Sequence, residues 1–215
     1  MLVGNRMSHP VITVRPDMPI QEAVELMRKE HVRRFPVVDD RGRLVGIVSE
    51  SDLLNASPSD VTSLNVWEIN YLLSKITVSK VMSTQVMTVS EDTTLEEAAR
   101  IMADHKIGGL PVMRGDELVG IITETNLFRI FLELLVAREK GLRLSVLVKD
   151  QPGALMALTK SIHDIGGNII AMGTFMGESA SDRTVVVKVN CVEMDALRTA
   201  VTPVVDEVVD LRNCC

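Results

Sequence analysis

One stretch of this sequence occurs twice, and the duplication restricts the chain to folds that pair two copies of one structural unit. The first copy spans residues 11–54 and the second spans residues 86–128. Adding 75 to Pro36 gives Pro111, and the offset falls to 74 after one deletion in a turn. A repeat that holds its register over this length predicts two similar folded units.

Each copy predicts the order strand, helix, strand, strand, helix. Residues 11–14 form a short extended run of strand-forming residues. Apolar residues then recur at the spacing of one buried helix face; they are Ile20, Ala23, Val24 and Met27 in the first copy and Leu95, Ala98, Ala99 and Met102 in the second. Two strands joined by a tight turn follow, and a second helix begins near Ser49 and near Thr123. The same dipeptide precedes both copies, as Met7-Ser8 and Met82-Ser83.

The sequence changes character outside the repeat. Between the copies, residues 66–73 predict a short linking helix. From Gly141 onward, strand and helix patterns alternate in the order βαββαβ, which is typical of a ferredoxin-like sandwich. We therefore expect an α+β protein with a first repeat domain at 1–55, a linker at 56–80, a second repeat domain at 81–140 and a third domain at 141–215.

The repeat resembles the cystathionine β-synthase (CBS) domain in its usual tandem arrangement, the Bateman module. The similarity is carried by the run PVVD-x-x-G-x-L-VGIVS-x-x-DLL and by its second copy PV…L-VGIIT-x-x-NLF. The resemblance implies two βαββα units related by a pseudo-two-fold axis. It also implies a regulatory module that binds adenine nucleotides or related adenosine compounds.

The C-terminal part resembles the ACT domain, a small amino-acid-sensing module. The similarity is carried by VLVKDQPGAL at a strand-to-helix junction and by IGGNII at the next strand. A tandem CBS pair followed by an ACT domain is similar to the acetoin-utilisation regulatory proteins of bacteria. That name describes a genetic context and implies no reaction.

The predicted ligand site lies where the last strand of each copy leads into a helix. Free N–H groups and the dipole at a helix N-terminus attract an anion such as phosphate, and an aspartate three residues later can accept hydrogen bonds from ribose hydroxyls. By the resemblance, Ser49 and Asp52 would contact phosphate and ribose in the first copy, and Thr123 and Asn126 in the second. By the same resemblance, the base would lie against Val11, Thr13, Val32, Pro36 and Val37, or against Val86, Thr88, Ile107, Pro111 and Val112.

A simpler interpretation of these residues is helix capping, since Ser49-x-x-Asp52 is an ordinary N-cap pattern. Glu50 and Glu124 stand beside the expected phosphate positions and would repel a phosphate that they faced. Arg33, Arg34 or Arg129 could offset that charge, although each is also explained as a solvated surface residue. A mononucleotide or an adenosine-type ligand is therefore expected to fit more easily than a triphosphate.

The ACT-like part has its own candidate positions. By the resemblance, Asp150, Pro152, Gly153 and Asn168 match the loop positions that bind amino acids. A turn followed by a helix cap, with Pro152 in the first helical turn, explains the same residues without a ligand. Many ACT domains pair subunits through sheet edges, which free strands here would permit.

The composition of the chain argues against several classes of protein. A formal net charge of −6 argues against a general nucleic-acid binder. No stretch is apolar and long enough to predict a membrane span, and no signal peptide is expected. The three cysteines show no metal or redox spacing, which predicts a reduced, cytoplasmic protein.

No catalytic set was found among the motifs, so we expect no catalytic residues, no metal and no cofactor used as a catalyst. The expected function is allosteric signal transduction through a regulatory ligand, with AMP, ATP and S-adenosylmethionine as candidates. We expect a homodimer formed through CBS and ACT surfaces, and a downstream protein partner that the sequence does not identify. A structural adaptor without any ligand, or a hydrolase with an unrecognised active site, are the alternatives.

Overall fold

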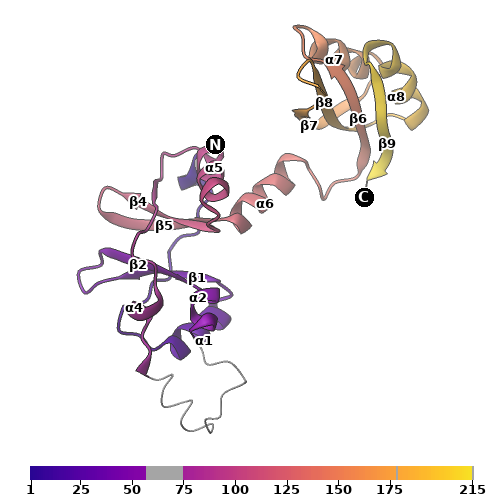
Figure 1. Cartoon of the computed structure of the whole chain (residues 1–215). Helices are drawn as coiled ribbons and strands as arrows, with labels where there is room; N and C mark the ends of the chain where they lie inside the picture. Colours follow the sequence, from indigo (N-terminus) through magenta and orange to yellow (C-terminus); the bar gives the residue numbers. More distant parts are fainter. Residues whose placement is uncertain (57–74, 178, 215) are drawn as a thin grey trace. The chain divides into compact units, whose positions relative to one another are not determined.

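The computed structural model describes residues 1–56, 75–177 and 179–214. The chain forms two compact units, Met1–Leu127 and Phe128–Cys215, whose elements are labelled in Figure 1. The helix expected at 66–73 lies outside the described residues.

The first unit contains the two copies of the repeat. The first copy forms α1 (Ile20–Glu30), β1 (Arg34–Val38), β2 (Leu44–Ser49) and α2 (Glu50–Asn55). The second copy forms β3 (Val89–Ser90), α5 (Leu95–His105), β4 (Gly109–Arg114), β5 (Glu117–Thr123) and α6 (Glu124–Leu134), whose later turns belong to the second unit. Short helices η1 (Val3–Asn5) and α4 (Val78–Val81) precede the two copies.

The predicted helix faces are confirmed as core. Ile20, Ala23 and Met27 are buried on α1, and Thr94 caps α5 by accepting a hydrogen bond from the Glu97 backbone N–H at 3.3 Å. The expected first strand at 11–14 is wrong for the first copy, where this segment forms a single parallel bridge, from Val14 to Val37, among the described residues. The second copy forms a two-residue strand, β3, that runs parallel to β4.

The segment before each copy packs on the other copy. Ser8 exchanges backbone hydrogen bonds with Ile121 of β5, at 2.8 and 3.1 Å, and Ser83 exchanges them with Ile47 of β2, at 2.9 Å each. Val78, which precedes the second copy in the chain, is fully buried in the core of the first. Each sheet is therefore completed by residues from the opposite side of the pseudo-two-fold axis.

The second unit is a four-stranded antiparallel sheet with helices on one face, as Figure 1 shows. It contains β6 (Gly141–Lys149), α7 (Ala154–Asp164), β7 (Asn168–Met176), β8 (Asp182–Asn190), α8 (Met194–Val201), η2 (Thr202–Val204) and β9 (Glu207–Cys214). The strand order β7-β8-β6-β9 is the ferredoxin-like arrangement that the sequence predicts.

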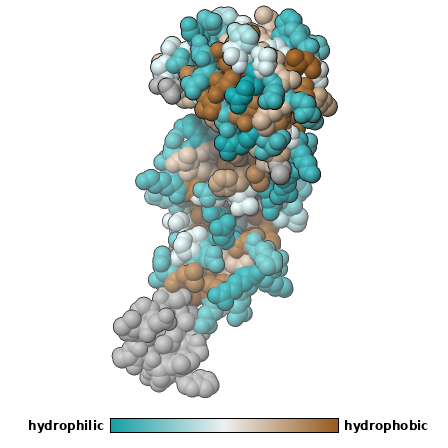
Figure 2. All heavy atoms as spheres, turned by 90° about the vertical axis from the view of Figure 1, so that its right-hand side faces the viewer, coloured by the Kyte–Doolittle hydropathy of each residue, from teal (hydrophilic) through white to brown (hydrophobic). Residues whose placement is uncertain are grey.

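The core of the second unit lies between that sheet and its two helices. Leu158 and Ile162 from α7 and Leu197 from α8 are fully buried against alternate residues of the central strands. The surface mixes hydrophobic and hydrophilic side chains (Figure 2). The other face of the sheet is not covered by α7 and α8.

Replacement of Phe35, which is fully buried in the first unit, tests how much core packing contributes to stability. We expect Phe35→Ala to lower the free energy of unfolding by about 3–5 kcal/mol, because it leaves a cavity among fully buried residues. Phe128→Ala, at a site that is 68% exposed, is the matched control and should change stability by no more than about 0.5 kcal/mol. Urea unfolding followed by circular dichroism measures both, and equal effects would contradict this view of the core.

Candidate functional site

A cavity of about 600 Å³ opens where the two copies of the repeat meet. The first copy contributes the end of β2 and the start of α2, and the second contributes its lead-in segment and the approach to β4. The lining residues are Arg34, Ile47, Ser49, Ser51, Asp52, Ser83, Gln85, Val86, Met87, His105, Lys106, Ile107, Gly108, Gly109 and Glu124. The volume lies within the range of about 300–1,000 Å³ that is usual for small-molecule sites.

Ser49 and Asp52 form a reciprocal cap at the start of α2. The Ser49 backbone N–H and hydroxyl both donate to Asp52 Oδ2, at 2.8 and 2.6 Å, and the Asp52 backbone N–H donates to Ser49 Oγ at 3.3 Å. The capping function expected from the sequence is therefore present. Among the described residues, the second carboxylate oxygen, Asp52 Oδ1, has no hydrogen-bond partner, so it remains able to accept one from a ligand in the cavity.

Arg34 supplies positive charge to the same cavity from β1. A Cβ atom at Gly108 would lie only 2.9 Å from Arg34 Nη1 and 2.7 Å from Glu124 Oε2, so the absent side chain leaves the space that both groups occupy. Burial lowers the pKa of the Arg34 guanidinium, and the Glu124 carboxylate acts in the opposite direction. Arg34 is thus partly desolvated beside Glu124, where an anion would gain more from it than at an open surface.

At the equivalent junction of the second copy, the side chain of Asn126 is hydrogen-bonded by other residues of the protein. Asn126 is buried, and its Oδ1 accepts from the Thr123 backbone N–H and hydroxyl at 3.0 and 2.6 Å. Its amide Nδ2 donates to Ser8 Oγ at 3.3 Å. Both polar ends of Asn126 are therefore in use, whereas Asp52 keeps one oxygen available.

The structure distributes the predicted contact residues differently from the two sets that the sequence suggested. Ser49 and Asp52 share their cavity with Val86 and Ile107, which were assigned to the other copy. Val86 lies beside the first copy because the segment that carries it, which includes Ser83, pairs with Ile47 of β2.

The other predicted residues do not line this cavity. Val37 and Val112 are fully buried in the cores, and Pro36 and Pro111 are buried with them. Thr13 and Val32 are half-buried and Thr88 is exposed. Val11 lines a separate hollow beside His9 and Pro10. The base contacts expected from the sequence stay a prediction, and of those residues Val86 and Ile107 line this cavity.

Sequence reasoning gave too little weight to Arg34 and missed Lys106 and Gly108. One signal was available in the repeat itself: adding 75 to Arg34 gives Gly109, so the copies differ at this point within an otherwise steady register. Two arginines at equivalent positions would approach each other across the pseudo-two-fold axis. Glycine on one side leaves room for the guanidinium on the other.

The four candidate residues of the C-terminal unit are engaged with protein partners or exposed. Asp150 Oδ2 accepts from Arg183 Nε at 3.0 Å, and the Asn168 amide donates to Asn190 Oδ1 at 3.0 Å. Pro152 is exposed, and Gly153 is the N-cap of α7 with a positive φ of 92° and no side-chain cap. Pro152 therefore precedes the helix and does not stand in its first turn, and the contacts of Asp150 and Asn168 join them to other parts of the unit.

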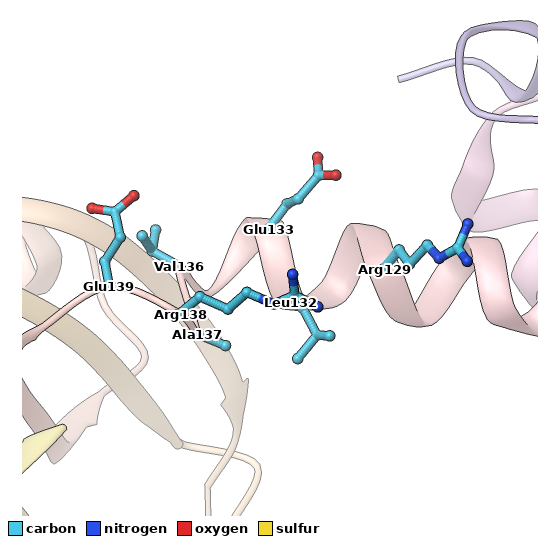
Figure 3. A pocket seen from close by; sticks show the side chains of 7 residues that line it. All are labelled: Arg129, Leu132, Glu133, Val136, Ala137, Arg138 and Glu139. Carbon is cyan, nitrogen blue, oxygen red and sulfur yellow. The ribbon is translucent and has the colours of Figure 1, made fainter. Parts of the chain in front are cut away.

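A hollow of about 520 Å³ lies along α6 and the turn that follows it. Figure 3 shows Glu133 and Glu139 pointing to the same side of the segment from separate places along it, and Arg129 pointing away from both. Its charged groups do not converge on one point, which is what a ligand site needs. This hollow, which belongs to the second unit, is therefore not a candidate ligand site.

Comparison with known proteins assigns both units. The CBS domain matches residues 3–59 and 78–133, which is more than half of the chain. The chain belongs to the CBS-domain family. A TTHA0829-like ACT domain matches residues 140–212, so the tandem CBS pair is followed by an ACT domain as the sequence predicts.

Solved structures of CBS pairs are similar to the first unit. An acetoin utilization protein (AcuB) from Vibrio cholerae is 34% identical with a TM-score of 0.53, covering 64% of this chain and 95% of that one. The CBS pair of protein MJ0100, in complex with 5′-methylthioadenosine and S-adenosyl-L-methionine, is 30% identical with a TM-score of 0.51, covering 61% and 95%. CBSX2 in complex with AMP is 30% identical with a TM-score of 0.52, covering 61% and 96%.

Curated relatives share mainly the CBS pair. L-aspartate semialdehyde sulfurtransferase of Methanocaldococcus jannaschii is 30% identical over 60% of this chain and 23% of its own length. CBSX1 of Arabidopsis thaliana chloroplasts is 36% identical over 56% of this chain and 59% of its own length. The chain thus spans between a quarter and three fifths of these relatives, so their whole activities do not transfer. In the described residues, no helix of this protein is long and apolar enough to cross a membrane.

The cap at α2 generates a prediction that needs no ligand. Ser49→Ala removes the hydroxyl that accepts from the Asp52 N–H, and we expect it to lower the free energy of unfolding by about 1 kcal/mol. Ser83→Ala is the control, because Ser83 lines the same cavity and its hydroxyl makes no hydrogen bond to the described residues. Thermal unfolding of ligand-free protein compares the two, and an equal loss in both would contradict the capping function.

Proposed function

We propose that this CBS pair is a sensor for an adenosine-containing ligand, which binds in the cavity at the junction of the two copies. The observation that carries the proposal is the meeting, in one cavity, of Asp52 with a free oxygen and the partly buried Arg34. The similar CBS pairs that hold AMP, 5′-methylthioadenosine and S-adenosyl-L-methionine support adenosine as the shared chemical group.

The lining residues suggest how the parts of such a ligand would be divided. Asp52 Oδ1 would accept hydrogen bonds from ribose hydroxyls. Val86 and Ile107 offer apolar contact for the base. Arg34 and Lys106 would face the 5′ substituent, with Glu124 close to them. Two cations beside one carboxylate leave a net positive charge that suits a single phosphate better than a triphosphate, so AMP is favoured over ATP. S-adenosylmethionine would meet the same cations with its carboxylate and would keep its sulfonium away from them.

The second junction would bind such a ligand more weakly. Asn126 already donates to Ser8 and accepts from Thr123, so a ribose there would have to replace protein hydrogen bonds. An amide oxygen is also a weaker acceptor than a carboxylate. One ligand per chain is the expected stoichiometry at moderate concentration.

The role we propose for the whole chain is regulatory and non-catalytic. Ligand binding at the copy junction would bias the packing of a homodimer, and a coupling of about 1–3 kcal/mol suffices for allosteric control. The ACT domain would sense an amino acid or hold the dimer together. A downstream protein would respond to the change, in the cytoplasm.

A purely structural adaptor is the second candidate. The observation that favours it is the Ser49–Asp52 cap, which explains both residues without a ligand. This alternative predicts that no adenosine compound and no amino acid shifts the melting temperature.

Isothermal titration calorimetry with AMP, 5′-methylthioadenosine, S-adenosylmethionine and ATP tests the proposal. We expect saturable binding of at least one of the first three, with ATP weaker. Asp52→Asn should weaken binding at least about ten-fold, because it removes the charge that holds the ribose while an oxygen remains to cap Ser49.

The control is Asp92→Asn, an exposed aspartate away from the cavity, which should bind like the unaltered protein. Asp52→Asn also recreates in the first copy the residue that the second copy has. Absence of heat with all four compounds, or equal affinity in Asp52→Asn, would exclude the sensor and leave the adaptor.

A further inference from the structure

Lys188 is a buried cation on β8. Only 6% of the residue is exposed. Its neighbours in the strand, Val187 and Val189, face the helices, so Lys188 lies on the opposite face of the sheet. Its ammonium group donates to the carbonyl oxygen of Val136 at 2.9 Å and to that of Glu139. The cation thereby ties the turn after α6 to the open face of the ACT sheet.

The negative charge near Lys188 is incomplete. In the part of the chain that the structure describes, no carboxylate lies within ion-pair distance of its ammonium. The two carbonyls provide dipoles for two of its three N–H groups. Buried charges in proteins are usually paired, because removing a cation from water is costly when no anion replaces the lost solvation.

A cavity of about 370 Å³ adjoins Lys188 on this face. Leu135, Ala137, Ala171 and Val186 form an aliphatic part of its wall, and Arg143 and Lys188 contribute the cations. This volume suits a small organic molecule.

Arg143 is only partly neutralised. Its Nη1 donates to Ser145 Oγ at 2.9 Å and to Asp210 Oδ2 at 3.2 Å. Asp210 also accepts from Arg212 at 2.7 Å, so one carboxylate serves two arginines. Lys188 and Arg143 both line the cavity, and Arg143 shares its carboxylate with Arg212, so the cavity favours an anion.

We propose that this cavity binds a small aliphatic carboxylate, whose oxygens pair with Lys188 and Arg143 and whose hydrocarbon part lies against the apolar wall. A zwitterionic amino acid fits less well, because none of the described residues that line the cavity offers a carboxylate to its ammonium group. Lys188 pairs with Arg143 near the start of β6, whereas the loop with Asp150 and Gly153 follows the end of that strand. The proposed carboxylate site does not depend on the adenosine site.

The test is a titration of the full chain with 3-methylbutanoate, followed by melting temperature and calorimetry. Two probes of the same shape are the controls: 3-methylbutanamide, which lacks the charge, and L-valine, which adds an ammonium group. We expect 3-methylbutanoate to raise the melting temperature in a concentration-dependent way and both controls to have little effect at about 10 mM.

Two variants locate the effect. Lys188→Met should weaken 3-methylbutanoate binding at least about ten-fold, and Lys149→Met, at an exposed position of β6, should not. Ala171→Leu keeps Lys188 and fills the cavity, so it should also abolish binding if Lys188→Met proves too unstable to measure. Methyl NMR shifts at Val186 should follow the same isotherm.

Three results would overturn the proposal. They are no response to 3-methylbutanoate at about 10 mM, an equal response to the amide, and unchanged binding in Ala171→Leu. If Ala171→Leu instead dissociates a dimer and 3-methylbutanoate has no effect, the face is a contact between copies of the chain. Because no probe contains adenosine, failure here leaves the proposed function of the CBS pair intact.

Discussion

The first unit depends on the exchange of backbone hydrogen bonds between each copy of the repeat and the segment that precedes the other copy. Ser8 pairs with Ile121, and Ser83 pairs with Ile47. Each pairing satisfies main-chain groups that would otherwise need another partner at a sheet edge. Because of it, neither copy has a complete sheet alone, and the cavity between them is formed by residues of both.

This arrangement explains why two nearly equivalent junctions differ in chemistry. The pseudo-two-fold axis places Asp52 and Asn126 in matching positions, but only Asn126 has both polar ends bound by the protein. Arg34 faces glycine where an exact repeat would place a second arginine. Small differences between duplicated residues thus leave Asp52 with an oxygen that has no partner among the described residues, whereas the polar atoms of Asn126 are hydrogen-bonded within the protein.

The sequence was enough to predict most helices and strands of both units, because the repeat, the apolar helix faces and the glycine-rich turns are local signals. It did not predict the short helices η1 and α4, and residues 11–14 form an isolated bridge in place of the expected strand. The ferredoxin-like order of the C-terminal unit followed from the same kind of pattern. Which residues share a cavity was harder to predict, since Val86 belongs to one copy in sequence and completes the other in space. The burial of Lys188 could not be predicted from the sequence, because a lysine that alternates with valines in a strand predicts an exposed position.

We propose that one ligand contacts both copies of the repeat at once. A ¹H–¹⁵N NMR titration with 5′-methylthioadenosine tests it most directly. We expect the backbone amides of Ser49, in the first copy, and of Gly108, in the second, to shift together along a single binding isotherm. Shifts confined to one copy, or separate isotherms for these two amides, would contradict it.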